Sequence, residues 1–190
     1  MPKATDSKEK TLFAAAQLFR RQGFHGTALQ DILTAGGAPR GSLYFHFPRG
    51  KEEIGEAALR LAGEIVRGKI ALAAEAAASA ETFLVGLARA MAVELQNSSF
   101  NDGCPIATTA LETSAQSLAL AAATRDAFQS WEREIARGLA RFDIADAEAI
   151  ATMVLSQLEG ALLLARTYHD PNPLQCAEQV LKLLLRAQSL

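Results

Sequence analysis

The sequence has little cysteine and no long apolar segment. Its two cysteines, Cys104 and Cys176, lie far apart and form no CxxC pair, so we expect no disulfide framework and a reducing cytoplasm. No apolar run approaches the roughly 18 residues that a membrane-spanning helix needs. The segment MPKATDSKEK at the start is polar and charged, so we expect neither a secretory signal peptide nor a membrane partner.

Motifs of catalysis and metal binding are also missing. The three histidines, His25, His46 and His169, include no HExxH motif and no pair spaced four residues apart for a metal. The sequence contains no GxSxG nucleophile elbow, no P-loop and no GxGxxG fingerprint. We therefore expect that the protein is not an enzyme and that it needs no cofactor and no metal.

Alanine and leucine, by contrast, are abundant. Hydrophobic residues make up 49% of the chain, while valine and isoleucine are sparse and strand-like alternation is absent. This composition favours packed helices over sheets, so the predicted fold class is all-α. Helices are expected at about residues 7–22, 27–35 and 39–47, in one long stretch from Lys51, and at 80–97, 105–115, 117–141, 146–168 and 173–188.

Glycine, threonine and proline mark the ends of the first three expected helices. Gly23 supplies the left-handed conformation that ends the first helix, and Thr27-Ala-Leu-Gln30 has the form of a capping box that begins the second. Pro39 fits the first turn of the third. Two short helices joined by a glycine-containing turn are typical of a helix-turn-helix. We predict such a domain at residues 1–51, followed by a larger helical domain at residues 52–190.

Charge is distributed unevenly between these two parts. Residues 1–51 carry a formal charge of +5, and residues 52–190 carry −7. A basic head on an acidic body is expected when only the head meets a polyanion such as DNA. A chance patch of solvated charge remains the alternative at this point.

The third expected helix carries the candidate base contacts. Leu43 and Phe47 lie four residues apart, so one face can bury both of them. Arg40 can then form a bidentate contact with a guanine edge, and Phe45 can touch a thymine methyl group. Other side chains here, and the start of the helix at Lys51, suit phosphate and sugar contacts. The predicted DNA-binding residues are Thr27, Pro39, Arg40, Ser42, Tyr44, Phe45, His46 and Lys51.

Several of these residues also have a purely structural interpretation. Thr27 is first of all a candidate helix cap. Tyr44 and Phe45 could be core aromatics of a small domain, and His46 could be a hydrogen-bonded structural histidine. Arg40 has the fewest structural explanations, so it is the strongest candidate for a base contact.

Residues 8–54 resemble the DNA-binding region of TetR-type repressors. The shared pattern is a first helix ending in Leu-Phe-x-x-x-Gly-Phe, then a threonine, then Ala-Gly-Gly-Ala-x-x-Gly-Ser-Leu-Tyr-x-His-Phe. The segments Phe47–Lys51, Gly103–Glu112 and Leu158–Arg166 are similar to those of the LmrA/YxaF-like branch. Phe45 departs from the pattern, because many relatives have a polar or histidine side chain there.

The resemblance implies a ligand-responsive regulator, usually a repressor, that binds a palindromic operator as a homodimer. The last two helices of each subunit would form a four-helix bundle, and small residues there would allow close approach. The same apolar stripes could also face only the core of one subunit. The candidate interface residues are Met153, Gln157, Gly160, Ala161, Leu164, Leu181 and Leu184.

The resemblance also implies a cavity for a small apolar or aromatic effector in the larger domain. Each aromatic residue there could equally be ordinary core. Cys104 precedes Pro105 at an expected helix start, where a thiolate is favoured, but an inert buried thiol or a pocket-lining one is the alternative. The candidate effector-binding residues are Phe83, Leu87, Met91, Phe100, Cys104, Thr108, Glu112, Phe128 and Trp131.

Three classes of function therefore compete. A ligand-responsive DNA-binding repressor agrees best with the residues between Gly41 and Lys51. A helical scaffold protein, whose basic head meets an acidic partner, is the second class. An enzyme with a site inside a helical bundle is the third, and the absence of catalytic motifs speaks against it.

Overall fold

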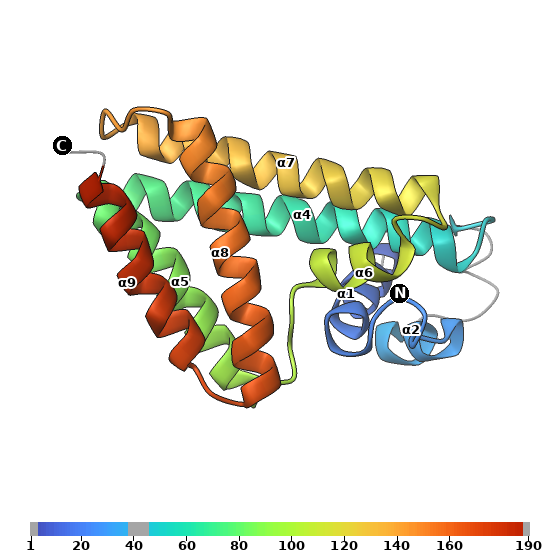
Figure 1. Cartoon of the computed structure of the whole chain (residues 1–190). Coiled ribbons are helices and arrows are strands. Elements are labelled where there is room, and N and C mark those ends of the chain that lie inside the picture. The colour runs from blue at the N-terminus through green and yellow to red at the C-terminus, as the bar shows by residue number, and fades with distance from the viewer. Residues whose placement is uncertain (1–3, 38–45, 188–190) are drawn as a thin grey trace. The chain divides into compact units, whose positions relative to one another are not determined.

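The structure is a computed structural model of the chain, and it describes residues 4–37 and 46–187, with side chains from Lys8 onward. The described residues form helices and no strand (Figure 1). The all-α fold class is therefore confirmed. The helices are α1 (Ala4–Gln22), α2 (Leu29–Gly36), α4 (Lys51–Ala76), α5 (Ala80–Asn97), α6 (Pro105–Thr113), α7 (Leu118–Ala140), α8 (Ala147–Tyr168) and α9 (Asn172–Ala187).

Glycine and proline end or begin several helices where the sequence predicts it. Gly23 follows α1 with φ of 79°, and Gly37 caps α2 with φ of 63°. Both values lie in the left-handed region that glycine adopts without a steric penalty. Pro105 occupies the first turn of α6, and Cys104 is its N-cap residue. Nearly all of the helix expected at residues 39–47 lies outside the described residues.

The start of α2 corrects one prediction. Its N-cap residue is Ala28, whose backbone N–H donates to Asp31 Oδ2 at 3.0 Å. Thr27 lies one residue earlier, and its hydroxyl donates to the carbonyl oxygen of Gly23 at 2.7 Å. The predicted capping box from Thr27 to Gln30 is therefore wrong, because the threonine hydroxyl bonds back into the preceding turn.

The described helices contribute to two compact units that are not continuous in sequence. The first unit comprises Met1–Ile65 and Cys104–Phe128, and the second comprises Val66–Gly103 and Gln129–Leu190. The long helices α4 and α7 are therefore each divided between the two units. This division differs from the expected boundary after residue 51, because α6 and the first parts of α4 and α7 belong with the helix-turn-helix segment.

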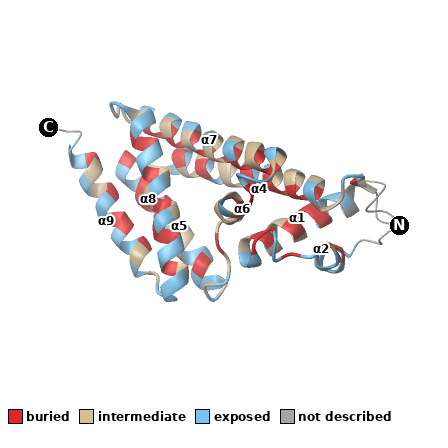
Figure 2. Ribbon diagram, turned by 45° about the vertical axis from the view of Figure 1, so that its right-hand side comes forward, coloured by how far each residue is buried: buried red, intermediate tan, exposed pale blue. Residues whose placement is uncertain are grey.

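Aromatic packing forms the core of the first unit. The rings of Phe19 and Phe24 lie 5.4 Å apart, and both side chains are buried. Gly55 of α4 lets the chain approach closely here, since a Cβ atom on it would lie 2.8 Å from the Phe24 ring and 3.1 Å from Leu120 of α7. Phe24 therefore packs between the end of α1 and the first turns of α4 and α7. Figure 2 shows the buried faces of these helices in red.

The second unit is built around α5, α8 and α9, which pack against one another (Figure 1). Gly138 of α7 permits another close approach, because a Cβ atom there would lie 2.6 Å from the Phe83 ring. Two buried carboxylates have cationic partners. Glu178 pairs with Arg89 at 3.0 Å, and Glu134 pairs with an arginine of α4 and another of its own helix. Paired in this way, the charges avoid the large cost of isolated burial.

Helix α8 is the one described helix that is long and apolar enough, by length and composition, to cross a membrane. Residues along it, among them Val154, Leu158 and Ala165, are buried against the neighbouring helices of the second unit. A core helix of a globular unit has this composition, so α8 is not an indication of a membrane protein.

Candidate nucleic-acid interface

The turn between α1 and α2 is a compact five-residue segment, Gly23–Thr27. The N–H of Gly23 donates to the carbonyl of Phe19 at 3.0 Å, and the N–H of Thr27 donates to that of Phe24 at 3.2 Å. The Thr27 hydroxyl closes the turn on Gly23. These bonds fix how α2, the first short helix of the predicted helix-turn-helix, leaves the end of α1.

A carboxylate from α6 completes this turn. Glu112 Oε2 accepts a hydrogen bond from the backbone N–H of His25 at 2.8 Å. Its other oxygen occupies the space beside Gly23, because a Cβ atom on Gly23 would lie only 1.9 Å from Glu112 Oε1. Glycine is required at this position for two reasons, its positive φ and the carboxylate beside it. The contact joins residues 87 positions apart, and no local pattern in the sequence signals it.

Lys51 lies beside the same turn, at the first residue of α4. Its Nζ lies 4.3 Å from the centre of the Phe24 ring, a cation–π distance. Burial lowers the pKa of Lys51 from its ordinary value, while the negative charge of Glu112 acts in the opposite direction. The ammonium group therefore lies over an aromatic ring and interacts electrostatically with the Glu112 carboxylate.

The structure places only some of the predicted DNA-binding residues. Thr27 is fully buried and its hydroxyl is used inside the turn, so its predicted phosphate contact is corrected to a structural role. The ring of His46 is half-buried and lies edge-on to Phe47, with their centres 6.4 Å apart. Lys51 is placed as described above. The predicted residues Pro39, Arg40, Ser42, Tyr44 and Phe45 lie outside the described residues.

The candidate effector-binding residues are divided between the two units. Phe83, Leu87, Met91, Phe100 and Trp131 belong to the second, and Cys104, Thr108, Glu112 and Phe128 belong to the first.

Within the second unit, Phe83 and Trp131 are almost completely buried, and Phe83 packs tightly against Gly138. Phe100 lies near His169, with their rings 5.7 Å apart. In the first unit, Thr108 donates its hydroxyl to the carbonyl of Cys104 at 2.8 Å. Glu112 contacts the turn of the head, a role that the sequence did not predict. An effector role for the other eight residues stays a prediction.

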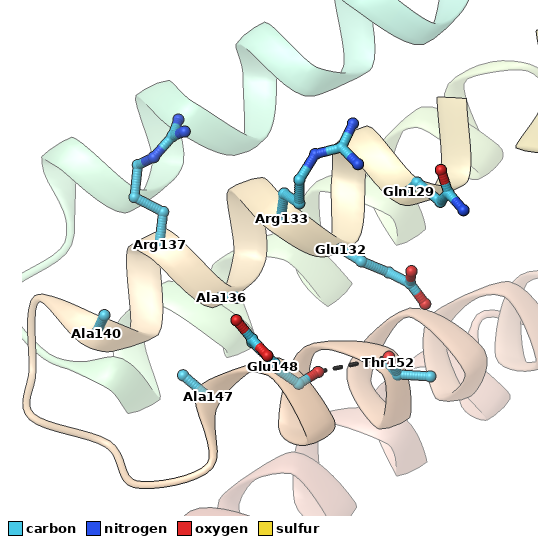
Figure 3. A pocket seen from close by; sticks show the side chains of 9 residues that line it. All are labelled: Gln129, Glu132, Arg133, Ala136, Arg137, Ala140, Ala147, Glu148 and Thr152. Carbon is cyan, nitrogen blue, oxygen red and sulfur yellow. Dashed lines mark hydrogen bonds between the residues drawn. The ribbon is translucent and has the colours of Figure 1, made fainter. Parts of the chain in front are cut away.

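One pocket of approximately 680 Å³ lies between α7 and α8 in the second unit (Figure 3). Charged and small side chains line it, including Glu132, Arg133, Arg137 and Glu148. None of the candidate effector-binding residues is among its lining residues. Its mixed charge differs from the apolar lining that an apolar ligand requires.

The candidate interface residues on α8 and α9 separate into two groups. Met153 and Leu164 are exposed on the surface of a single chain, and a Cβ atom on Gly160 would meet open space. Ala161 and Leu181 are buried in the core of their own chain, which removes them from the predicted interface. One candidate residue on each helix, Ala161 on α8 and Leu181 on α9, therefore faces inward. Gln157 and Leu184 are half-buried, and the exposed residues that the sequence pattern did not indicate are Leu163, Tyr168, Val180 and Leu183.

Two protein-family models match the chain. Residues 12–61 match the bacterial regulatory proteins of the tetR family, and residues 80–180 match the transcriptional regulator LmrA/YxaF-like C-terminal domain. The uncharacterized HTH-type transcriptional regulator YxaF of Bacillus subtilis is 34% identical over 183 residues, covering 95% of this chain and 96% of that protein. The HTH-type transcriptional regulator LmrA of the same organism is 33% identical, covering 93% of this chain and 97% of that protein.

Solved structures share the fold. One is the TetR family transcriptional regulator CifR, a cysteine mutant in complex with a 26-bp double-strand operator. It has a TM-score of 0.73 at 24% sequence identity, and the match covers 92% of this chain and 94% of that one. Together with the family models and the relatives, this fold likeness leads to one assignment. The chain belongs to the TetR family of DNA-binding transcriptional regulators, in its LmrA/YxaF-like group, and it is not an enzyme.

Proposed function

We propose that the protein is a ligand-responsive repressor of the cytoplasm that binds a near-palindromic operator as a homodimer. A small apolar or aromatic effector would release it. The observation that carries the proposal is a basic head, in which the turn Gly23–Thr27 sets the direction of α2, on a chain whose residues 12–61 match the tetR family model. The crystallised neighbour CifR was solved with its operator duplex, which supports the same use of the head here.

The proposed DNA contacts divide into two kinds. Arg40 and Phe45 would read base edges in the major groove. Pro39, Ser42, Tyr44, His46 and Lys51 would position the head on the sugar–phosphate backbone, which contributes affinity but no sequence information. Lys51 is the member of this set that the structure describes in most detail. Its ammonium group would exchange the Phe24 ring and the Glu112 charge for a phosphate.

An exposed apolar face on α8 and α9 supports the proposed dimer. On α8, Met153, Gly160 and Leu164 follow one another at helical spacing, and all three are exposed. On the neighbouring helix α9, Val180 and Leu183 are 45% and 62% exposed. Apolar surface of this kind on adjacent helices is typical of an interface with a second copy. Two heads are also what a palindromic site requires.

The proposed effector would act through the separation of the two heads. Half-sites on one duplex are spaced by about 34 Å per helical turn, so a shift of a few ångströms prevents both heads from docking. An effector shifts this equilibrium only through its different affinities for the two states, and a 100-fold preference corresponds to about 2.7 kcal/mol. Met91 and Trp131 are the proposed contacts in the second unit.

The Lys51 phosphate contact predicts a specific salt dependence. Lys51→Met should weaken binding to all duplexes similarly and reduce the slope of log affinity against log salt by about one for each head. The change in stability should be small, because burial disfavours the ammonium in the folded state while its contact with the Phe24 ring favours it. The measurement is fluorescence anisotropy across salt concentrations. Lys69→Met is the matched control, since Lys69 pairs with Glu94 in the second unit; an equal change in slope for the control would refute the contact.

The base contact of Arg40 predicts a change in sequence preference. Arg40→Ala should lower affinity by about 1–3 kcal/mol and relax selection at one position in each half-site. Duplexes selected by wild type and variant from a random pool, then sequenced, give the two preferences. Identical affinity and identical selected sequences would show that Arg40 reads no base.

We predict that a charged substitution in the proposed dimer interface converts the dimer to a folded monomer. In Gly160→Arg the new side chain has open space within its own subunit, because no atom lies within 4 Å of a Cβ atom there. The variant should therefore fold, yet sediment as a monomer, since pairing would bury an uncompensated charge. Gly86→Arg is the control, because Gly86 on α5 is equally exposed and open. A dimeric Gly160→Arg protein would move the interface elsewhere.

The effector model predicts that compounds release preformed protein–duplex complexes. A library of small apolar and aromatic compounds should contain members that do so for wild type. Trp131→Phe, chosen to keep the core packed, should shift their release curves to higher concentration while leaving duplex affinity without compound nearly unchanged. Identical release curves would remove Trp131 from the site, and a library without any active compound would contradict the induction model.

A further inference from the structure

We infer that Glu112 of α6 is a positioning residue for operator recognition, because its carboxylate binds the turn that sets the direction of α2. The inference deepens the proposed function and rests on it. It starts from one contact inside the first unit, the hydrogen bond from the His25 N–H to Glu112 Oε2 at 2.8 Å. A bond to a charged acceptor is about twice as strong as one between neutral groups.

The turn depends on this carboxylate because its own residues leave His25 without a local acceptor. The neighbouring N–H groups of Gly23 and Thr27 donate to carbonyls of α1 and of the turn. The N–H of His25 is the one that reaches another helix. Without Glu112 the His25 N–H would donate to water instead, and the turn would be less rigid.

The space around Gly23 gives a second indication. A Cβ atom on Gly23 would overlap Glu112 Oε1 at 1.9 Å, a separation that real Cβ contacts do not show. The backbone of Gly23, with φ of 79°, thus forms one wall of a site shaped for the carboxylate. Gly23 and Glu112 are therefore complementary: the residue without a side chain lies where the carboxylate packs.

Charge gives a third indication. Glu112 acts on Lys51, whose ammonium lies over Phe24 in the middle of the same turn. The carboxylate therefore has contacts with the turn at His25 and an electrostatic interaction with the first residue of α4. Glu112 thus acts on the turn before α2 and on the start of α4, the two segments that flank residues 28–50 in the sequence.

Two substitutions separate the hydrogen bond from the charge. Glu112→Gln keeps an oxygen that can accept from the His25 N–H but removes the negative charge, whereas Glu112→Ala removes both. The control is Glu75→Ala, which removes an exposed acid from α4 in the second unit. Binding is measured on a duplex that wild type selects from a random pool and on a scrambled duplex of equal length. Hydrogen exchange of the His25 amide is measured on the same proteins.

For Glu112→Ala we expect affinity for the selected duplex to fall about tenfold, as loss of a charged hydrogen bond allows. Affinity for the scrambled duplex should not fall, because nonspecific binding depends on positive charge and a negative charge has been removed. The His25 amide should exchange faster. Glu112→Gln should keep slow exchange and most of the selectivity, and Glu75→Ala should match wild type in every measurement.

A second variant tests the same contact from the side of Gly23. Gly23→Ala should displace the carboxylate and lower selectivity; in a Glu112→Ala background the strain of the positive φ remains but the overlap is gone, so the two substitutions together should cost less than the sum of their separate effects. Additive effects of the two substitutions would overturn the inference, as would wild-type selectivity of Glu112→Ala. Failure of wild type to select any duplex would instead overturn the proposed operator binding, and the exchange of His25 would still report on the contact.

Discussion

The first unit depends on how the chain turns at Gly23–Thr27. Phe24 enters the core between α1, α4 and α7, and the Thr27 hydroxyl closes the turn onto Gly23. Hydrogen bonds within the turn satisfy some of its backbone, and the Glu112 carboxylate satisfies the N–H of His25. A short helix such as α2 has little stability alone, so its direction is set by this turn and by tertiary packing. DNA recognition by the head requires that direction to be fixed.

The same contacts explain why the compact units do not follow the order of the chain. Helix α6 contributes Glu112 to the turn, and α7 contributes Leu120 to the packing around Phe24. Arg60 of α4 binds Asp126 of α7 at 3.2 Å and strengthens the same unit at its surface. The helix-turn-helix segment is therefore one part of a larger core. Its stability comes from residues far along the chain as well as from its own helices.

Local patterns in the sequence were sufficient to predict the described helices and the family, but they did not predict the long-range contacts. Gly23 and Pro105 act at helix ends through their own backbone preferences, so those ends were predictable. Thr27 misled the prediction because its hydroxyl can cap a helix or bond back into a turn with similar energy. Tertiary packing decides which half of an apolar stripe faces inward, as at Ala161 and Leu181. The contact of Glu112 with His25 has no local signature at all.

The central claim is that the first unit binds DNA as a single body, in which α6 supports the turn Gly23–Thr27. Hydrogen exchange of the whole chain, with and without a duplex selected by the protein, tests it most directly. The account predicts slower exchange across residues 23–54 and also in α6, while the exposed face of α8 and α9 is unchanged by DNA. Slowing that is confined to the second unit, or that reaches residues 23–54 but leaves α6 unaffected, would contradict the account.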